Sequence, residues 1–468
     1  MAENYDMAVL GGGPGGYVAA LRGRQLGLSV LLVEKEQLGG TCLNRGCIPT
    51  KALLSDVEGL QWAIRGAREG LLDRKPVINF NVIMKRKADV VSKLVSNLEK
   101  LLTSSGVTLI NGSAKILEPG ILITDTGRIV RSANIVIATG SRSWIPPIIG
   151  ADLPGVLTTR QILELEKVPG KLVIIGGGVI GQEFAAIFSS LGSQVTILEA
   201  LDRILNEVDQ EIARRYSSLL SSRGITTEVG VQVKGIERSQ TGLKVPYEKG
   251  SKEKVATADL ILIATGRRPN LEGSGILELG VRLNNGAIEV DQFLQTSVNG
   301  VYAVGDVLGR KMLAHVASYH GEIVAENIYG HNRPCEDEVV PGCIFTTPQM
   351  AWAGLTEEQA KESGRPFRTS SFSLSSSGKA QAVGEPRGLI KLIEDTGTGR
   401  LIGAHFMGPH VSELIGEAAL AIRKGLSASD IADTIHPHPT LSEAMREAAL
   451  GFLDGPIHAA SRRKIFIG

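Results

Sequence analysis

The chain contains two copies of one pattern, and this repetition constrains its fold more than any other feature. In each copy an apolar, β-branched strand ends in G-x-G-x-x-G, a helix-like segment follows, and a second apolar strand ends in a glutamate. The first copy reads YDMAVLGGGPGG and then LSVLLVE, and the second reads KLVIIGGGVIGQE and then SQVTILE. Glu34 lies 18 residues after Gly16, and Glu199 lies 18 residues after Gly181. The matched spacing predicts two Rossmann-like dinucleotide-binding units.

Each residue type in the pattern has a physical role in holding a dinucleotide. The first glycine allows a tight turn, the second lets a pyrophosphate approach the backbone, and the third lets the helix pack close to the strand. The glutamate can accept hydrogen bonds from a ribose 2′-OH. The alternative is that the glycines form turns in two ordinary βα units. That alternative does not explain the matched glutamates or the two later strands that end in ATG. The predicted residues are Gly11, Gly13, Gly16, Glu34 and Thr139-Gly140 in the first copy, and Gly176, Gly178, Gly181, Glu199 and Gly266 in the second.

The rest of the pattern indicates further elements and a further domain. Apolar residues spaced by three and four between Val82 and Leu102 predict a long amphipathic helix with a solvated Lys and Arg face. GVYAVGDV predicts a buried strand ending at Gly305-Asp306, and MLAHVA predicts the start of a helix. From about Val340, three apolar segments and ELIGEAALAIRKG predict a separate C-terminal α+β domain.

Composition excludes several functional classes. Fifty basic residues balance 49 acidic ones, so we expect neither a nucleic-acid partner nor a membrane surface as partner. No apolar run reaches the ~18 residues of a membrane-spanning helix, and no secretion signal is visible in MAENYDMAVL. Four cysteines in so long a chain predict a reducing, cytoplasmic setting in which a disulfide is transient and catalytic rather than structural.

Two of those cysteines, Cys42 and Cys47, lie in GGTCLNRGCIPTKALL. A zinc site would need further ligands that the sequence does not bring near, so we predict no metal. A structural disulfide across so small a loop would remove little entropy from the unfolded chain and so stabilise little. We therefore favour the interpretation that the two cysteines are redox-active thiols. A regular helix would hold the two Cα atoms beyond the ~7 Å that a disulfide tolerates, so we expect a bent turn relieved by Gly46. Lys51 would lie on the face of Cys47, where it could lower a thiolate pKa or touch a flavin; an ordinary surface lysine is the alternative.

A candidate base lies in IHPHPTLSEAMREAAL. Pro437 and Pro439 favour extended backbone at the residues before them, so His436 and His438 cannot share a helix face. Glu443 then lies close enough to orient one ring nitrogen of His438 and leave the other free as a base. A structural histidine is the ordinary alternative.

With these motifs together, the chain resembles the class I pyridine nucleotide-disulfide oxidoreductases over almost its full length. GGTCLNRGCIPTKALL resembles their redox-active disulfide motif, and HPHPTLSEA resembles their C-terminal base motif. The resemblance implies a glutathione-reductase-like fold of class α/β, with two Rossmann-like domains and a C-terminal α+β dimerisation domain. It divides the chain into an FAD-binding domain (1–145), an NAD-binding domain (146–268), a central domain completing the FAD site (269–338) and an interface domain (339–468).

The resemblance also assigns roles to residues. Cys42 would be the outer thiol that meets substrate, Cys47 the inner thiol beside FAD, and His438, oriented by Glu443, the acid/base that serves the other subunit's disulfide. Positions matching FAD contacts are Gly11, Gly13, Gly16, Glu34, Lys51, Ala114, Thr139, Gly140, Ser141, Asp306, Met312, Leu313, Ala314 and His315. Positions matching NAD contacts are Gly176, Gly178, Gly181, Glu183, Glu199, Val233 and Gly266, and Glu183 would also pair with Lys51. Two stretches depart from the pattern: Ser377-Gly378-Lys379-Ala380 stands where the family often has Asn-x-Arg-Ala, and Tyr319-His320 stands where it often has an acidic pair.

The expected activity is oxidation of protein-bound dihydrolipoamide to lipoamide with NAD⁺. The expected partners are a second copy of the chain and the lipoyl domains of a 2-oxo acid dehydrogenase or glycine-cleavage complex. A glutathione reductase, or another NAD(P)H-dependent disulfide reductase of the same fold, is the first alternative, but Glu199 would repel a 2′-phosphate and so favours NAD over NADP. A non-catalytic flavoprotein scaffold is the second, and it gives no reason for Cys42, Cys47, His438 and Glu443 to occur together.

Overall fold

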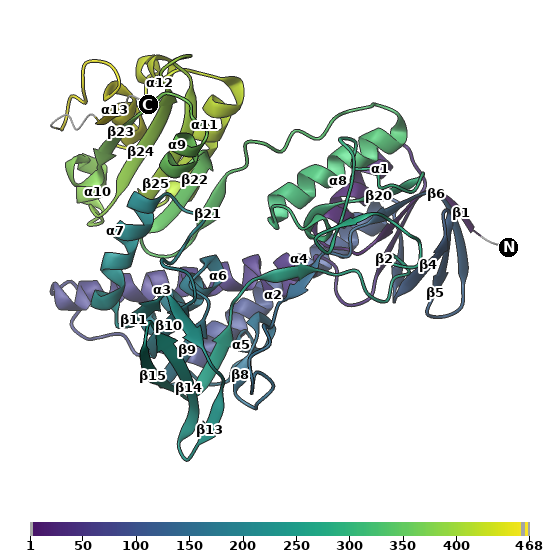
Figure 1. Ribbon diagram of the computed structural model, residues 1–468, viewed down its shortest axis with the longest axis horizontal. Coiled ribbons are helices and arrows are strands. Elements are labelled where there is room, and N and C mark those ends of the chain that lie inside the picture. Colours follow the sequence, from purple (N-terminus) through teal and green to yellow (C-terminus); the bar gives the residue numbers. More distant parts are fainter. Residues whose placement is uncertain (1–2, 460–463, 467–468) are drawn as a thin grey trace.

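The computed structural model describes residues 3–459 and 464–466 of the 468-residue chain. Figure 1 shows three lobes, one built on the first glycine pattern, one on the second and one on the C-terminal segment. Two lobes contain parallel sheets with helices, and the third has an antiparallel sheet with helices, so the predicted fold class is confirmed.

A seven-stranded sheet forms the first lobe. Its strands follow the order β3-β2-β1-β6-β5-β4, parallel from β3 to β6 and antiparallel beyond, and β20 pairs in parallel with β6. A strand from the segment 269–338 thus joins a sheet whose other strands end before residue 138. Helices α1 and α8 pack together on this sheet (Figure 1). The elements are β1 (Glu3–Leu10), β2 (Val30–Glu34), β3 (Thr108–Asn111), β4 (Ala114–Glu118), β5 (Ile121–Thr124), β6 (Ile129–Ile137), β20 (Val301–Ala303), α1 (Pro14–Gln25), η2 (Gly305–Leu308) and α8 (Ala314–Tyr329).

The second lobe repeats the arrangement on a smaller scale. A parallel sheet in the order β11-β10-β9-β16-β8 carries α6 and α7, and an antiparallel sheet of β12, β14, β13 and β15 adjoins it. The short pair β7 (Ser141–Ser143) and β17 (Arg267–Pro269) links this lobe to the first. The elements are β8 (Val156–Leu157), α5 (Thr159–Ile162), β9 (Lys171–Ile175), α6 (Val179–Ser190), β10 (Gln194–Glu199), α7 (Gln210–Leu220), η1 (Ser221–Arg223), β11 (Ile225–Val229), β12 (Val231–Val233), β13 (Glu237–Ser239), β14 (Gly242–Lys249), β15 (Lys252–Ala258) and β16 (Leu260–Ile263).

Two long helices, α3 (Cys47–Arg68) and α4 (Phe80–Ser104), leave the first lobe and pack beside each other. Leu53, Leu54 and Val57 of α3 are buried in the core of the second lobe. The helix that begins at Cys47 is therefore fixed by apolar packing against a neighbouring lobe. The helix predicted over Val82–Leu102 is confirmed as α4, but Lys87 does not belong to a solvated face, because it is buried and donates a hydrogen bond to the Leu163 carbonyl at 2.6 Å.

The third lobe is an antiparallel sheet in the order β21-β22-β25-β24-β23-β26, with α11 and α13 packed against it. The predicted strands and helix after Val340 are confirmed. The strand predicted in GVYAVGDV ends at Ala303, two residues early, and η2 follows it. The remaining elements are β18 (Leu283–Asn284), β19 (Ala287–Ile288), β21 (Gly342–Ile344), β22 (Gln349–Gly354), α9 (Glu357–Glu362), β23 (Phe367–Ser373), η3 (Leu374–Ser376), α10 (Gly378–Ala382), β24 (Leu389–Asp395), β25 (Leu401–Gly408), α11 (Val411–Lys424), α12 (Ala428–Asp433), α13 (Glu443–Leu450) and β26 (Lys464–Phe466).

Candidate active site

Most of the predicted site residues line one cleft of about 2210 Å³. Its walls come from both glycine loops, from the start of α3 and from the segment between η2 and α8. Predicted residues that line it are Gly11, Glu34, Cys42, Cys47, Lys51, Ala114, Thr139, Gly140, Ser141, Gly176, Gly178, Glu183, Glu199, Val233, Gly266, Asp306, Met312, Leu313, Ala314 and His315. Gly13 belongs to the first loop, and Gly16 and Gly181 lie in the first turns of α1 and α6, but none of the three lines the cleft. His438 and Glu443 also lie outside it.

The two glycine loops form matching cradles. Gly11 and Gly176 both have a positive φ, +108° and +112°, and a Cβ at either would collide with a carbonyl oxygen of the strand end that reads ATG. Glu34 accepts a hydrogen bond from the Gly12 N–H at 2.7 Å, and Glu199 accepts one from the Gly177 N–H at 2.5 Å. Each acid therefore stands at the mouth of its glycine turn, where a ribose bound on the loop would meet it. A tight turn that admits no Cβ at its first glycine, with an acid beside it, fits a dinucleotide-binding loop in both copies.

The thiol pair lies where two helices meet. Helix α2 (Gly40–Arg45) ends before Gly46, whose φ of −143° and ψ of −110° are not helical, and α3 begins at Cys47. The predicted bend between the two cysteines is confirmed. Cys42 and Cys47 are free thiols that hydrogen-bond to each other. The hydrogen bond from Cys42, together with the charge of Lys51, holds the pKa of Cys47 below its usual range despite burial, whereas the same bond and burial raise the pKa of Cys42. The two environments therefore favour a thiolate at Cys47 and a protonated thiol at Cys42.

Lys51 lies one turn after Cys47 and is held in place by a buried acid. Its Nζ contacts both carboxylate oxygens of Glu183 at 2.9 Å and lies 4.6 Å from the centre of the Phe345 ring. Glu183, in α6, has a side chain only 5% exposed and also accepts the Phe345 N–H at 3.0 Å. The predicted pairing of Lys51 with Glu183 is confirmed, and it ties the thiol helix to the second glycine helix.

Arg267, which the sequence reasoning missed, supports the first cradle. Its Nε and Nη2 donate to the Ser141 hydroxyl and carbonyl, both at 2.7 Å, and Ser141 in turn donates to Asp306 at 2.5 Å. Nη2 also reaches the Thr41 hydroxyl at 3.3 Å. Burial lowers the pKa of Arg267, although the Asp306 charge opposes this. The only signal in the sequence was its place directly after the second ATG strand end.

His438 and Glu443 form the predicted pair, but far from the thiols of the same chain. His438 Nδ1 lies 2.9 Å from Glu443 Oε1, and Glu443 Oε2 accepts the Thr440 N–H at 2.8 Å. Burial would raise the pKa of Glu443, but the bonds from Thr440 and His438 outweigh it and lower the pKa. The His438 side chain is 79% exposed, and Figure 1 shows α13 in a different lobe from α2. One chain therefore presents the imidazole outward rather than to its own Cys42.

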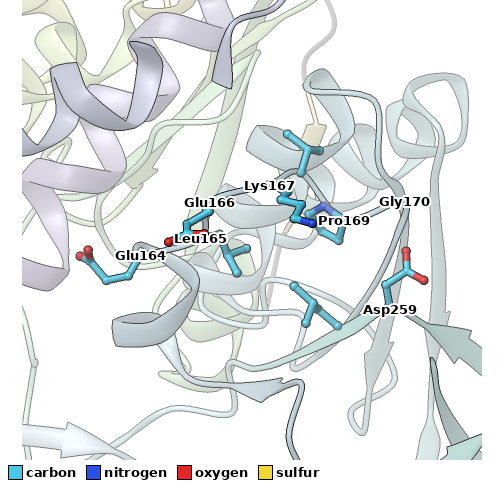
Figure 2. A pocket seen from close by; sticks show the side chains of 9 residues that line it. Glu164, Leu165, Glu166, Lys167, Pro169, Gly170 and Asp259 are labelled. Carbon is cyan, nitrogen blue, oxygen red and sulfur yellow. The ribbon is translucent and has the colours of Figure 1, made fainter. Parts of the chain in front are cut away.

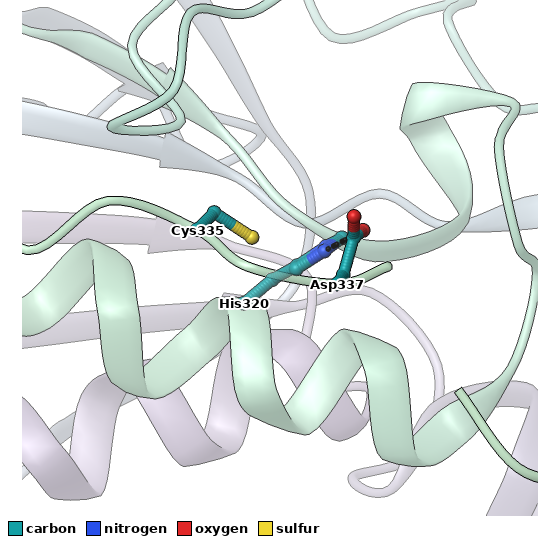
Figure 3. A group of neighbouring side chains, drawn as sticks. All are labelled: His320, Cys335 and Asp337. Atoms are coloured by element: carbon teal, nitrogen blue, oxygen red, sulfur yellow. Dashed lines mark hydrogen bonds and ion pairs between the residues drawn. The ribbon is translucent and has the colours of Figure 1, made fainter. Parts of the chain in front are cut away.

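The remaining two cysteines have raised pKa values. Burial raises the pKa of both Cys335 and Cys343 to about 11. Cys335 lies beside His320 and Asp337, with one ligand atom of each within 4.8 Å of the others (Figure 3). The Gly305 N–H donates to His320 Nδ1 at 3.3 Å, so neutral His320 carries its proton on Nε2, which faces Asp337 at 3.1 Å. A proton already occupies the position that a metal would need, so His320 and Asp337 form a hydrogen-bonded support for the turn at Gly305.

A second, smaller hollow of about 530 Å³ lies at the opposite end of the second sheet. Figure 2 shows Glu164, Glu166, Lys167 and Asp259 around it, near the start of β9. Dinucleotides bind at the carboxyl ends of parallel strands, and Gly176 marks that end of β9. The hollow is therefore not part of the nucleotide site.

Two dinucleotide cradles and a thiol pair in one cleft define the class of flavin-dependent disulfide oxidoreductases that use a pyridine nucleotide. The chain belongs to the pyridine nucleotide-disulphide oxidoreductase family, whose profile matches residues 5–321; the profile of the family's dimerisation domain matches residues 340–449. It is an oxidoreductase whose cofactors are FAD and NAD, as the sequence predicted. Within the described residues, no helix combines the length and apolar content that a membrane crossing requires.

Relatives of known name are similar over nearly the whole chain. Dihydrolipoyl dehydrogenase of Bacillus subtilis is 39% identical over 473 residues, covering 98% of this chain and 100% of the relative. Dihydrolipoyl dehydrogenase of Thermus scotoductus is 40% identical, with the same coverage. Among solved structures, the HOCl-induced flavoprotein disulfide reductase RclA from Escherichia coli has a TM-score of 0.86 at 30% identity, covering 95% of this chain and 99% of that one. LpdA from Mycobacterium tuberculosis has a TM-score of 0.88 at 26% identity, covering 97% and 100%.

Proposed function

We propose that this enzyme oxidises dihydrolipoamide to lipoamide and reduces NAD⁺ to NADH. The observation that carries the proposal is the asymmetric thiol pair in the wall of a cleft shared by both cradles, in a chain whose relatives of similar length are named dihydrolipoyl dehydrogenase. A thiolate at Cys47 and a protonated Cys42 are the state expected after a dithiol substrate has reduced the pair.

In the proposed reaction one substrate thiolate attacks Cys42 Sγ of the oxidised pair, and Cys47 leaves as a thiolate. The second substrate thiol then gives up its proton and attacks the substrate sulfur of the mixed disulfide; the S–S bond of lipoamide forms, the bond to Cys42 Sγ breaks, and Cys42 takes a proton to return as a thiol. His438 of the partner subunit accepts the substrate proton, because within one chain His438 faces outward. Glu443 holds the imidazole so that Nε2 is free for this transfer. The homodimer is part of the proposal, and the match of residues 340–449 to the dimerisation domain supports it.

The two cradles are proposed to hold the cofactors. FAD would lie on the first cradle, with Glu34 at its ribose and with Ala114, Asp306 and the segment Met312–His315 along its length. NAD would lie on the second, with Glu199 at its ribose and Val233 nearby. Bound FAD supplies the two-electron relay between the reduced thiol pair and NAD⁺. The chain itself positions Lys51 against Glu183, which keeps a positive charge beside the Cys47 thiolate.

The division into four domains (1–145, 146–268, 269–338 and 339–468) is also part of the proposal. Apolar residues of 269–338 share a hydrophobic core with the first lobe, which supports a role in completing the FAD site. Lipoyl domains of a 2-oxo acid dehydrogenase or glycine-cleavage complex are the proposed source of substrate, and a reducing compartment such as the cytoplasm is the proposed location.

A rate comparison tests the proposal. Dihydrolipoamide with NAD⁺ should turn over faster than glutathione disulfide with NADPH, and the reverse order would refute the substrate assignment. Cys47→Ser should abolish thiol-dependent turnover with FAD still bound, whereas Cys335→Ser, a thiol outside the cleft, should leave turnover unchanged. The dimer is tested separately by sedimentation of the FAD-loaded protein.

A further inference from the structure

Arg203 is the cation on the loop that follows the second cradle's acid. It lies four residues after Glu199 and lines the same cleft. In dinucleotide folds, an arginine near this position accommodates the 2′-phosphate of NADP. The charge of Arg203 alone would therefore work against a preference for NAD.

The structure holds this guanidinium in bonds within the protein. Nε donates to the Asn206 side chain at 2.9 Å, and Nη2 donates to the Asn206 carbonyl at 3.3 Å. Nη1 donates to Glu358 Oε1 at 2.6 Å. Each of the three nitrogens donates one hydrogen bond within the protein, so turning the guanidinium toward a phosphate would break bonds to Asn206 and Glu358.

Glu358 approaches from a different lobe. It lies in α9 of the third lobe, and its second oxygen, Oε2, is buried without a hydrogen-bond partner. A buried carboxylate oxygen with no partner is costly, so Arg203 is the contact that compensates Glu358 in this position. Release of Arg203 toward a phosphate would leave Glu358 uncompensated.

A neighbouring network fixes the geometry of α9 against the loop. The Glu357 N–H donates to Asp209 at 3.2 Å, and Lys391 Nζ contacts Asp209 at 2.9 Å and Glu357 at 2.6 Å. Asp209 lies six residues after Arg203 and is fully buried. The loop that carries Arg203 is therefore held at both ends, by Glu199 at the glycine turn and by α9 from outside.

We propose that Glu358 is a specificity residue for the pyridine nucleotide: it neutralises Arg203 and keeps it from a 2′-phosphate, so that Glu199 and Glu358 together select NAD over NADP. The inference rests on the assignment of the second cradle to NAD in the proposed function. Glu199 repels the phosphate directly, and Glu358 removes the attraction that Arg203 would otherwise provide. Among the loop's other charged residues, Glu207 lines the same cleft and adds to the repulsion.

Binding of NAD⁺ and NADP⁺ to the FAD-loaded protein, measured by isothermal titration calorimetry without a thiol substrate, tests the proposal. Glu358→Ala should raise the affinity for NADP⁺ relative to NAD⁺ by about fivefold, the scale of one exposed charge-assisted contact. Glu358→Gln keeps the shape and should shift the ratio in the same direction by less. The double variant Glu358→Ala with Arg203→Ala should return the ratio to that of the native protein.

Glu362→Ala is the matched control, because it removes an exposed carboxylate from the same helix outside the network that holds the Arg203 loop; its ratio should stay native. An unchanged ratio in both Glu358 variants, a gain that survives loss of Arg203, or an equal gain in Glu362→Ala would overturn the proposal. The binding measurement contains no thiol substrate, so its result does not depend on which thiol the enzyme oxidises. Failure of the native enzyme to oxidise dihydrolipoamide would refute the proposed substrate but not the role of Glu358.

Discussion

The two thiols of the active site differ in acidity because each one's environment favours a different protonation state. Cys42 donates to Cys47, and Lys51 adds a positive charge that favours the Cys47 thiolate, so the pKa of Cys47 falls to about 7. A thiolate present near neutral pH beside a neutral thiol is the arrangement that lets one sulfur exchange with substrate while the other holds the charge.

Lys51→Met should therefore raise the pKa of Cys47. With the lysine charge removed and Glu183 left nearby, the thiolate should first form at a pH higher by about one unit, so less of it exists at pH 7. The measurement is thiolate absorbance against pH in a Cys42→Ser background, which keeps a donor to Cys47; Cys343 also lines the cleft, but its pKa of about 11 separates its titration from that of Cys47. Lys85→Met, a change at an exposed lysine paired with Asp89, is the control. An unchanged titration in Lys51→Met would remove Lys51 from the electrostatics of the thiol.

His438→Gln should slow reduction of the enzyme by dihydrolipoamide by about 100-fold or more, the usual contribution of a positioned base. NAD⁺ affinity should not change, because the imidazole lies outside the cleft. Rapid-mixing kinetics with dihydrolipoamide and a separate NAD⁺ titration measure the two effects. Glu443→Gln should give a smaller loss, since it removes the orienting carboxylate and keeps the base. Equal losses in both measurements would contradict the assignment of His438 as base.

How far the site could be predicted depends on how far apart its residues lie in the sequence. Glu443 follows His438 by five residues, and spacing sufficed to pair them. The pairing of Lys51 with Glu183 needed a family resemblance, because 132 positions separate them. Arg267 and Phe345 were missed, since each reaches the site from a strand or loop whose path the local pattern does not determine. The attachment of Glu358 to Arg203 depends on how two lobes pack, which no local motif encodes.

At the scale of elements, two glycines near the turn between β9 and α6 have different roles: one is needed for packing and the other leaves room for the nucleotide. A Cβ at Gly181 would collide with the Gly176 carbonyl oxygen, whereas one at Gly178 would meet nothing within 4 Å. Gly181→Ala should therefore lower the thermal midpoint of unfolding and weaken NAD⁺ binding. Gly178→Ala should keep the thermal midpoint and weaken only NAD⁺ binding, because its open space faces the nucleotide.

Differential scanning calorimetry and NAD⁺ titration distinguish the two variants. If Gly178→Ala binds NAD⁺ like the native protein, the cradle assignment is wrong. The same turn shows why the elements themselves were predictable: β9 is buried and apolar, its glycines fix the turn, and both signals are local. That β20 would join the first sheet was not predictable from the pattern, because a three-residue strand carries no information about its neighbour in the sheet.

At the scale of the whole molecule, the second and third lobes meet through buried charge. Lys391 is 2% exposed and contacts Asp209 and Glu357, while Asp209 also accepts the Glu211 N–H at the start of α7. The cost of bringing these groups out of water is met by their mutual attraction, so the network is sensitive to loss of one member. It places the loop that follows Glu199 in a fixed position relative to the lobe that matches the dimerisation domain.

Lys391→Met should destabilise the protein by about 3–5 kcal/mol, because it leaves Asp209 charged, buried and unpaired. The expected result is a lower thermal midpoint, and adding Asp209→Asn should recover part of the loss because the two sites are coupled. Arg142→Ala, which breaks the exposed pair with Glu272, should change stability by no more than about 0.5 kcal/mol. If Lys391→Met unfolds at the native midpoint, the lobes are held together by apolar packing alone, and the position of Arg203 would not depend on this network.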